Sequence, residues 1–188
     1  REAVVTTVLF VCTANICRSP YAAHALRGAL SDVSGFTVRS AGVRSDWLEI
    51  VGEPACPEMP APEGMDLLQD HSATQLTLDM VREADIIITF EAVHRAAVVD
   101  LLPRAQVKTY TANQAQRLAR AVAAVHWPPA APERSDDVLR NLNAARSWAP
   151  YEDDADVSDP HGLGIEAHLD CAREIDSMVQ ALASVLKP

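Results

Sequence analysis

A cysteine and an arginine stand six positions apart in CTANICRSP, residues 12–20. The apolar run TTVLFV, residues 6–11, comes directly before Cys12 and predicts a buried strand. After Ser19 the apolar residues follow a helical period, and Pro20 suits a first helical turn. The stretch therefore predicts a strand, a tight turn that begins with a thiol, and a helix that begins at Ser19, which suits a helix cap.

A strand, turn and helix of this kind predict phosphate binding. Backbone N–H groups of the turn and of the helix N-terminus point into one concavity, and the helix dipole adds positive potential there. That field favours a thiolate at Cys12, while the planar guanidinium of Arg18 suits bidentate contact with two phosphate oxygens. The parts predict covalent phosphoryl transfer, in which Cys12 attacks phosphorus and water then releases phosphate. A carboxylic acid is expected nearby to protonate the leaving group.

The C-x5-R pattern followed by Ser-Pro resembles the signature of low molecular weight protein tyrosine phosphatases. A second marker of that family, Asp-Pro on a loop before the last helix, is matched by VSDPHGLG, residues 157–164. Further motifs follow the family's order: SAG (40–42), VGEPACPEM (51–59), DHSATQLT (70–77) and EAVHR (91–95). The resemblance spans residues 4–111 and 157–186.

The resemblance implies three catalytic residues. Cys12 is the expected nucleophile and Arg18 the phosphate clamp, while Asp159 acts as general acid in the first step and as base toward water in the second. The expected substrates are phosphorylated proteins, above all at tyrosine, or small aryl phosphates. Phosphoarginine is less favoured, since relatives acting on it tend to carry threonine where Ile16 stands. Neither a cofactor nor a metal ion is implied.

The resemblance also assigns residues around the catalytic ones. The substrate-binding residues would be Thr13, Ala14, Asn15, Ile16, Cys17, Ser19 and Trp47. Ser19 would donate to the thiolate, and Trp47 would line the pocket entrance. Asn15 would hold the left-handed residue of the turn, supported by Ser40 and His71. Cys17 is a possible redox partner of Cys12.

Three departures from the family pattern carry expectations of their own. Ala14 replaces a usual glycine and predicts about 1 kcal/mol of strain if its φ is positive. His161 and Gly162 replace tyrosines that usually grip an aromatic substrate ring. Residues 112–150 are predicted to be a helical insertion that folds as a hairpin beside the active site. An aromatic residue in this segment or directly after it would replace the missing tyrosines: Trp127, Trp148 or Tyr151.

Strands and helices alternate along the rest of the chain. Apolar runs predict strands at 36–42, 84–90 and 107–110, and helical periods predict helices at 77–84, 91–103, 114–125, 135–146 and 164–186. The pattern predicts an α/β fold over residues 1–188 as a single phosphatase domain. Its core would be a four-stranded parallel sheet flanked by helices on both faces.

Composition narrows the class of protein. Among 188 residues, 48% are hydrophobic and 22% charged, which is typical of a globular chain. The formal charge of −10 disfavours binding to nucleic acid or to acidic membrane surfaces. No apolar run approaches the roughly 20 residues needed to span a bilayer. Four cysteines are too few for a disulfide scaffold, and a reducing cytoplasm is expected.

Two other functions fit the same residues. An arsenate reductase shares the fold and loop, although Cys56 and Cys171 do not match the redox pair of thioredoxin-coupled forms. A non-catalytic phosphate-binding module would bind phosphate without turnover. A zinc site formed by His161, His168 and Cys171 is disfavoured, because these residues do not make a complete ligand set. The pattern leaves the oligomeric state open.

Overall fold

The predicted parallel sheet is present in the computed structural model, which describes residues 5–60, 71–125, 135–150, 152 and 156–187. The described strands are β1 (Thr6–Cys12), β2 (Phe36–Gly42), β3 (Ile86–Thr89) and β4 (Thr109–Thr111). All pair in parallel, in the order β2-β1-β3-β4. The predicted four-stranded parallel sheet is therefore confirmed, with β1 inside it.

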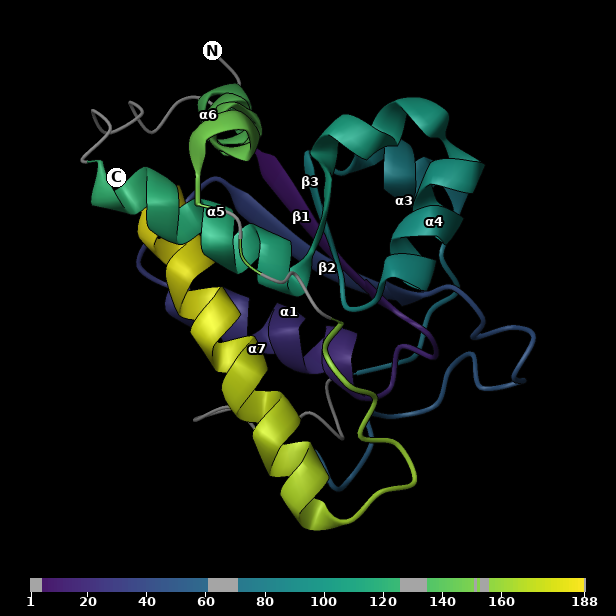
Figure 1. Ribbon diagram of the computed structural model, residues 1–188. Helices are drawn as coiled ribbons and strands as arrows, with labels where there is room; N and C mark the ends of the chain where they lie inside the picture. Colours follow the sequence, from purple (N-terminus) through teal and green to yellow (C-terminus); the bar gives the residue numbers. More distant parts are fainter. Residues whose placement is uncertain (1–4, 61–70, 126–134, 151, 153–155, 188) are drawn as a thin grey trace.

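Helices cover both faces of this sheet, also as predicted. Figure 1 shows α1 (Arg18–Ala29), α5 (Ala112–Ala124) and α7 (Ile165–Leu186) on one face. The helices α3 (Leu78–Glu83) and α4 (Ala92–Leu101) lie on the other. None of the described helices is both long and apolar enough to cross a membrane.

The continuous apolar run of β1 follows from this layering. Val8 and Phe10 point into the core under α1, α5 and α7, whereas Leu9 and Val11 point into the core under α3 and α4. All four side chains are at most 1% exposed. Side chains alternate between the faces of a strand, so a strand covered on both faces is apolar at every position.

The fourth strand is shorter than its sequence predicts. Val107 and Lys108 belong to the 3-10 helix η1 (Pro103–Lys108), and β4 starts only at Thr109. Pro103 occupies the first turn of η1, and Thr109 Oγ1 donates to the carbonyl of Ala105 (2.7 Å). The prediction was wrong for these two residues because the apolar pattern of Val107 suggested burial, whereas its side chain is 53% exposed.

Residues 112–150 contain two helices, α5 and α6 (Ser135–Trp148). Helix α6 packs on α5 and lies beside the start of β4, where Arg146 Nη2 donates to the carbonyl of Thr109 (3.1 Å). Figure 1 shows α6 near the amino end of β1, at the opposite end of the sheet from Cys12. The predicted position beside the active site is therefore wrong for α6 and its Trp148. Trp127 and Tyr151 lie outside the described residues.

Candidate active site

Cys12 ends β1 at the place where an α/β sheet opens a crevice. The strand lies between β2 and β3, and the helices that follow β1 and β3 lie on opposite faces of the sheet. A ligand crevice forms at the carboxyl ends of strands where such connections diverge. Cys12 is 3% exposed there, and its Sγ accepts a hydrogen bond from the backbone N–H of Asn15 (3.3 Å). We call residues 12–18 the Cys12 loop.

Ser19 lies in the first turn of α1 and faces the Cys12 thiol. Its Oγ is 3.0 Å from Cys12 Sγ and accepts from Asn15 Nδ2 (2.8 Å). Its hydroxyl proton has two acceptors within reach, the carbonyl of Ala41 (3.4 Å) and the sulfur, and an ionised sulfur is the closer and the charged one. A thiolate at Cys12 would therefore accept hydrogen bonds from a backbone N–H and a hydroxyl.

Asn15 has the left-handed conformation that the resemblance implies, with φ 60°. Its Oδ1 accepts from the backbone N–H of Thr74 (2.9 Å), and its carbonyl accepts from His71 Nε2 (2.6 Å). Asparagine tolerates this conformation better than most residues, and the side-chain contacts hold it there. Burial, the largest effect on His71, lowers its pKa. These contacts agree with the expected supporting role of His71.

The end of β2 and the turn that follows it support the Cys12 loop through Gly42 and Ser45, neither of which had a role in the sequence analysis. Ser45 Oγ donates to the carbonyl of Ala14 (2.9 Å), while Ser40 has no hydrogen bond to Asn15 among the described residues. A Cβ on Gly42 would lie 2.8 Å from backbone atoms of the loop and 2.2 Å from Ser45 Oγ. Gly42 therefore lets β2 approach the loop closely, and the SAG motif was the available signal.

Ala14 does not have the backbone strain that was predicted for a positive φ at this position. Among the described non-glycine residues, positive φ occurs at Asn15 and Glu49, so Ala14 does not have a positive φ. Its methyl group has no conformational cost of the kind that a positive φ would bring.

Arg18 is the point where distant segments meet. Its side chain is 1% exposed, and its Nη1 contacts Glu91 Oε1 (2.5 Å) while Nη2 contacts Asp159 Oδ2 (2.9 Å). Nη1 also donates to the carbonyl of Val157 (2.8 Å). Burial alone lowers the pKa of Arg18, but the charges of Cys12, Asp159 and Glu91 together raise it above its usual value. The guanidinium is therefore a permanent cation beside the thiol.

The segment that carries Asp159 is held mainly through its first residues. We call residues 156–164 the Asp159 loop. Val157 N–H donates to the carbonyl of Phe90 (2.9 Å), and Asp156 Oδ1 accepts from the first N–H of α4, at Ala92 (2.8 Å). Asp159 itself keeps 43% of its side chain exposed. Asp159, the predicted acid, and Arg18, the predicted clamp, therefore form an ion pair in the structure.

Glu91 and His94 also belong to the site, although the sequence analysis gave them no role. They stand three residues apart at the start of α4 and face the Cys12 loop, where His94 Nε2 is hydrogen-bonded to Thr13 Oγ1 (2.8 Å). His94 is fully buried, and burial is the main cause that lowers its pKa to about 4. The i, i+3 spacing in EAVHR was a usable signal for two residues on one helix face.

The outer rim of the site is more open. Thr13, Ala14 and Ile16 are partly exposed, and Trp47 is 73% exposed, with the guanidinium of Arg44 5.5 Å from the centre of its ring. The loop before Trp47 is joined to the Cys12 loop, since Arg44 N–H donates to the carbonyl of Thr13 (2.9 Å). A position at the pocket entrance stays a prediction for Trp47.

Cys17, within the Cys12 loop, is buried and is a free thiol, as are the other cysteines. Its pKa is raised, mainly by burial and next by Cys56, whose charge opposes a second thiolate. The ligand atoms of Cys17, Cys56 and His161 lie within 4.8 Å of one another, a set able to hold a metal ion. The redox pairing of Cys17 with Cys12 stays a prediction.

Comparisons with known proteins agree with this geometry. The profile of the family described as "Low molecular weight phosphotyrosine protein phosphatase" matches residues 7–126, which include the Cys12 loop and α5. The low molecular weight protein-tyrosine-phosphatase Etp of Escherichia coli K12 is 36% identical over 111 residues, 57% of this chain and 70% of Etp. A protein-arginine-phosphatase of Geobacillus stearothermophilus is 24% identical over 180 residues, 96% of this chain and 95% of that protein.

A solved structure extends the likeness to the whole chain. The tyrosine phosphatase AmsI of Erwinia amylovora superposes with a TM-score of 0.67 at 25% identity, covering 100% of this chain and 97% of AmsI. The predicted family is thereby confirmed, while the status of residues 112–150 as an insertion stays a prediction. This chain belongs to the low molecular weight phosphotyrosine protein phosphatase family.

Proposed function

We propose that the protein hydrolyses phosphotyrosine in proteins, with Cys12 as nucleophile, Arg18 as phosphate clamp and Asp159 as general acid. The observation that carries this proposal is the position of Arg18. Its guanidinium lies 2.9 Å from the carboxylate of Asp159. Arg18 itself is the first residue of α1, at the end of the loop that begins with Cys12. Nucleophile, clamp and acid thus surround one position for a phosphoryl group.

Substrate binding rearranges the ion pairs of Arg18. A phosphate dianion entering the Cys12 loop presents two oxygens to the guanidinium fork, in competition with the exposed carboxylate of Asp159. Glu91 is more enclosed, with 26% of its side chain exposed, and stays beside Nη1. Exchange at Nη2 therefore frees Asp159 to turn toward the leaving-group oxygen, while Glu91 keeps the guanidinium in place.

The chemical steps follow from these contacts. Cys12 Sγ forms a bond to phosphorus as the bond to the leaving oxygen breaks, and Asp159 gives that oxygen a proton. Ser19, 3.0 Å from the sulfur, stabilises the thiolate before attack and again when it leaves. Asp159 then takes a proton from the water that attacks the phosphocysteine, which releases inorganic phosphate.

Phosphoarginine is a second candidate substrate. The match to the arginine phosphatase of Geobacillus stearothermophilus covers 96% of this chain, whereas the match to the tyrosine phosphatase Etp covers 57%. His161 and Gly162, in place of tyrosines, also offer less grip on an aromatic ring. Ile16 argues against phosphoarginine, because relatives that act on phosphoarginine tend to carry threonine at this position.

The decisive experiment is steady-state hydrolysis of p-nitrophenyl phosphate by wild type and Cys12→Ser, without added metal. We expect turnover in wild type and none in Cys12→Ser. Cys171→Ser is the matched control, since it removes another buried thiol, on α7, and should leave turnover intact. Absence of turnover in the reduced wild type would reject the phosphatase and favour a phosphate-binding module.

Two further substrates separate the alternatives. A phosphotyrosine peptide and a phosphoarginine peptide of the same sequence are compared by kcat/KM, and we expect a preference for phosphotyrosine. The reverse preference would assign the protein to phosphoarginine. Oxidation of thiols that depends on arsenate, with no phosphatase turnover, would indicate an arsenate reductase.

A further inference from the structure

Cys56 is the centre of a cluster of metal-binding side chains that the phosphatase chemistry does not use. The ligand atoms of Cys56, Glu58 and His168 lie within 4.8 Å of one another, and so do those of Cys17, Cys56 and His161. Both sets share the Cys56 thiol, which is buried and free. Sequence spacing hides this cluster, because Cys56 and His168 are 112 positions apart.

Distances within the cluster already suit a zinc ion. Cys56 Sγ lies 3.5 Å from His168 Nε2 and 2.9 Å from Glu58 Oε2. Zinc–sulfur and zinc–nitrogen bonds of about 2.3 and 2.0–2.1 Å, at the tetrahedral angle, place the two ligand atoms about 3.5 Å apart. The sulfur and the imidazole therefore need almost no movement. Glu58 is exposed and can withdraw slightly to make room for the ion.

His168 is oriented as a metal ligand usually is. Its ring is 1% exposed, and Nδ1 is 3.1 Å from the carbonyl of Gly164. A carbonyl only accepts, so Nδ1 carries the proton of the neutral ring and Nε2 presents its lone pair toward Cys56. A backbone carbonyl that holds the second nitrogen of a ligating histidine fixes both tautomer and ring orientation.

The fourth ligand is best supplied by His161. It lies in the Asp159 loop, its side chain is exposed, and it already approaches Cys56. Cys17 is the other neighbour, but burial opposes its ionisation and it lies inside the Cys12 loop. One thiolate, one carboxylate and two neutral imidazoles would also balance the charge of Zn²⁺, so that no net charge is buried.

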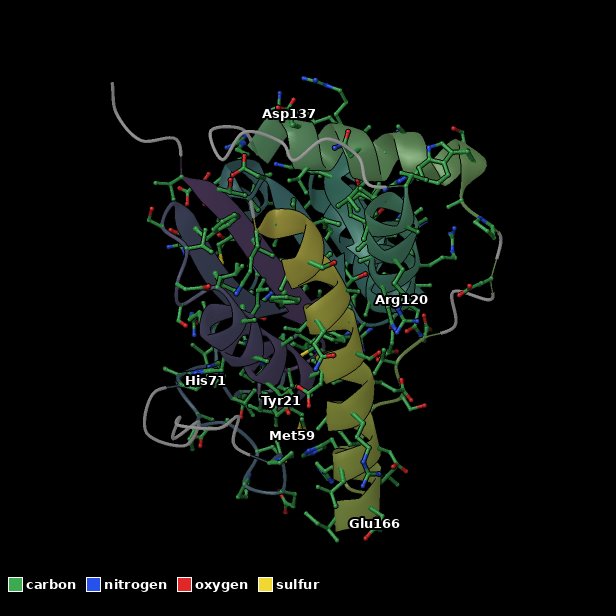
Figure 2. All side chains as sticks on the ribbon, turned by 90° about the vertical axis from the view of Figure 1, so that its left-hand side faces the viewer. Tyr21, Met59, His71, Arg120, Asp137 and Glu166 are labelled. Atoms are coloured by element: carbon green, nitrogen blue, oxygen red, sulfur yellow. The ribbon has the colours of Figure 1, made fainter. Side chains whose placement is uncertain are left out.

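We propose that Cys56, Glu58, His161 and His168 bind a zinc ion that joins the Asp159 loop to α7 and to the segment behind the Cys12 loop. The contacts of Cys56 show the link, since its N–H donates to the carbonyl of Ile16 (2.7 Å). Met59 belongs to the same segment as Cys56, and Figure 2 shows it beside the amino-terminal half of α7, the half that contains Glu166. The ion would thus restrain His161, two residues beyond the catalytic Asp159.

Cobalt(II) titration of the metal-free Cys12→Ser protein tests the site, because this background removes the catalytic thiol as a ligand. We expect one equivalent to bind, with a thiolate-to-cobalt charge-transfer band and the intense visible bands of a tetrahedral site. Zinc should displace the cobalt. Cys56→Ser in the same background should abolish the charge-transfer band, whereas Cys171→Ser, which changes a buried thiol outside the set, should retain it.

Loss of binding in a variant of a buried residue could also come from misfolding. Glu58→Gln avoids this ambiguity, because the side chain of Glu58 is exposed and its substitution should not disturb the fold. We expect at least tenfold weaker zinc binding in Glu58→Gln and in His161→Gln, with unchanged circular dichroism. A charge-transfer band that survives Cys56→Ser, or equal zinc affinity in all variants, would overturn the proposal. Turnover of p-nitrophenyl phosphate by the metal-free wild type is measured separately. If no zinc binds, the phosphatase assignment is unaffected, and if turnover is absent, the zinc site is unaffected.

Discussion

The Cys12 loop and the Asp159 loop meet at Arg18 but are held in very different ways. Cys12, Asn15 and Ser19 are at most 3% exposed, and their polar atoms contact one another or the segments beside them. Asp159 is 43% exposed, and its described side-chain partners are Arg18 and the backbone N–H of His161. The proposed nucleophile is thus enclosed by its own sequence neighbours, while the proposed acid depends on a contact made across the chain.

This difference assigns distinct energetic roles to the two loops. The Cys12 loop is preorganised, so its donors need little reorganisation when charge develops on the transferring phosphoryl group. The Asp159 loop is anchored at Val157 and Asp156 but leaves its carboxylate free to exchange partners. Catalysis by this protein should therefore depend most on the clamp and somewhat less on the acid.

Arg18→Lys should have the largest effect. Lysine keeps the charge but not the planar fork, so it cannot contact Glu91, the Val157 carbonyl and two phosphate oxygens together. We expect kcat/KM for p-nitrophenyl phosphate to fall by about 10²–10³-fold. Activity within threefold of wild type would show that charge alone suffices. Arg39→Lys, in a surface ion pair with Glu83, is the matched control and should leave kinetics unchanged.

Asp159→Asn should have a smaller effect that depends on the leaving group. The amide cannot donate a proton as an acid does, and a poor leaving group needs that proton more. We expect kcat to fall by about 10²-fold with phenyl phosphate and by less with p-nitrophenyl phosphate. Asp170→Asn, on the exposed side of α7, controls for loss of a carboxylate. Equal losses with both substrates would argue that Asp159 only positions Arg18.

The same contrast explains what could be predicted from sequence. The Cys12 loop is local, so the C-x5-R spacing, the apolar strand before it and Pro20 after it already define its geometry. Asp159 was found only through the Asp-Pro marker of the family. Physical pattern alone does not connect residues 141 positions apart, such as Arg18 and Asp159.

The residues that sequence reasoning missed act through tertiary contacts. Gly42 is needed because β2 passes close to the Cys12 loop, and Ser45 replaces the expected support from Ser40. The position of α6 could not be predicted either, because amphipathic periodicity identifies a buried face but not the element that covers it. Packing of α6 beside the start of β4 is decided by contacts such as Arg146 with Thr109.

His94 contacts the Cys12 loop through Thr13, and its titration should make stability depend on pH. Burial lowers its pKa to about 4 in the folded protein, against 6.5 for an ordinary histidine. Between these values the unfolded chain binds more protons, so the stabilising contribution is complete above pH 6.5 and is lost as pH falls toward 4. The loss should be on the order of 3 kcal/mol.

The measurement is the free energy of urea unfolding at several pH values, for wild type and His94→Gln. Because burial also lowers the pKa of His71, some pH dependence should remain in the variant. The difference between the two proteins isolates His94, and it should shrink as pH falls from 7 to 4. A constant difference would mean that His94 stabilises the Cys12 loop only through its contact with Thr13.

Trp47→Ala should have the smallest effect and tests the open side of the site. The side chain is 73% exposed and stacks with Arg44, so we expect the free energy of unfolding to change by less than about 0.5 kcal/mol. If Trp47 contacts the aromatic ring of the substrate, KM for p-nitrophenyl phosphate should rise about threefold to tenfold with kcat unchanged. An alkyl phosphate without a ring is the control, since its kinetics should not respond. Unchanged KM for p-nitrophenyl phosphate, or an equal change for both substrates, would show that Trp47 does not recognise the ring and would leave recognition of the leaving group to the Asp159 loop.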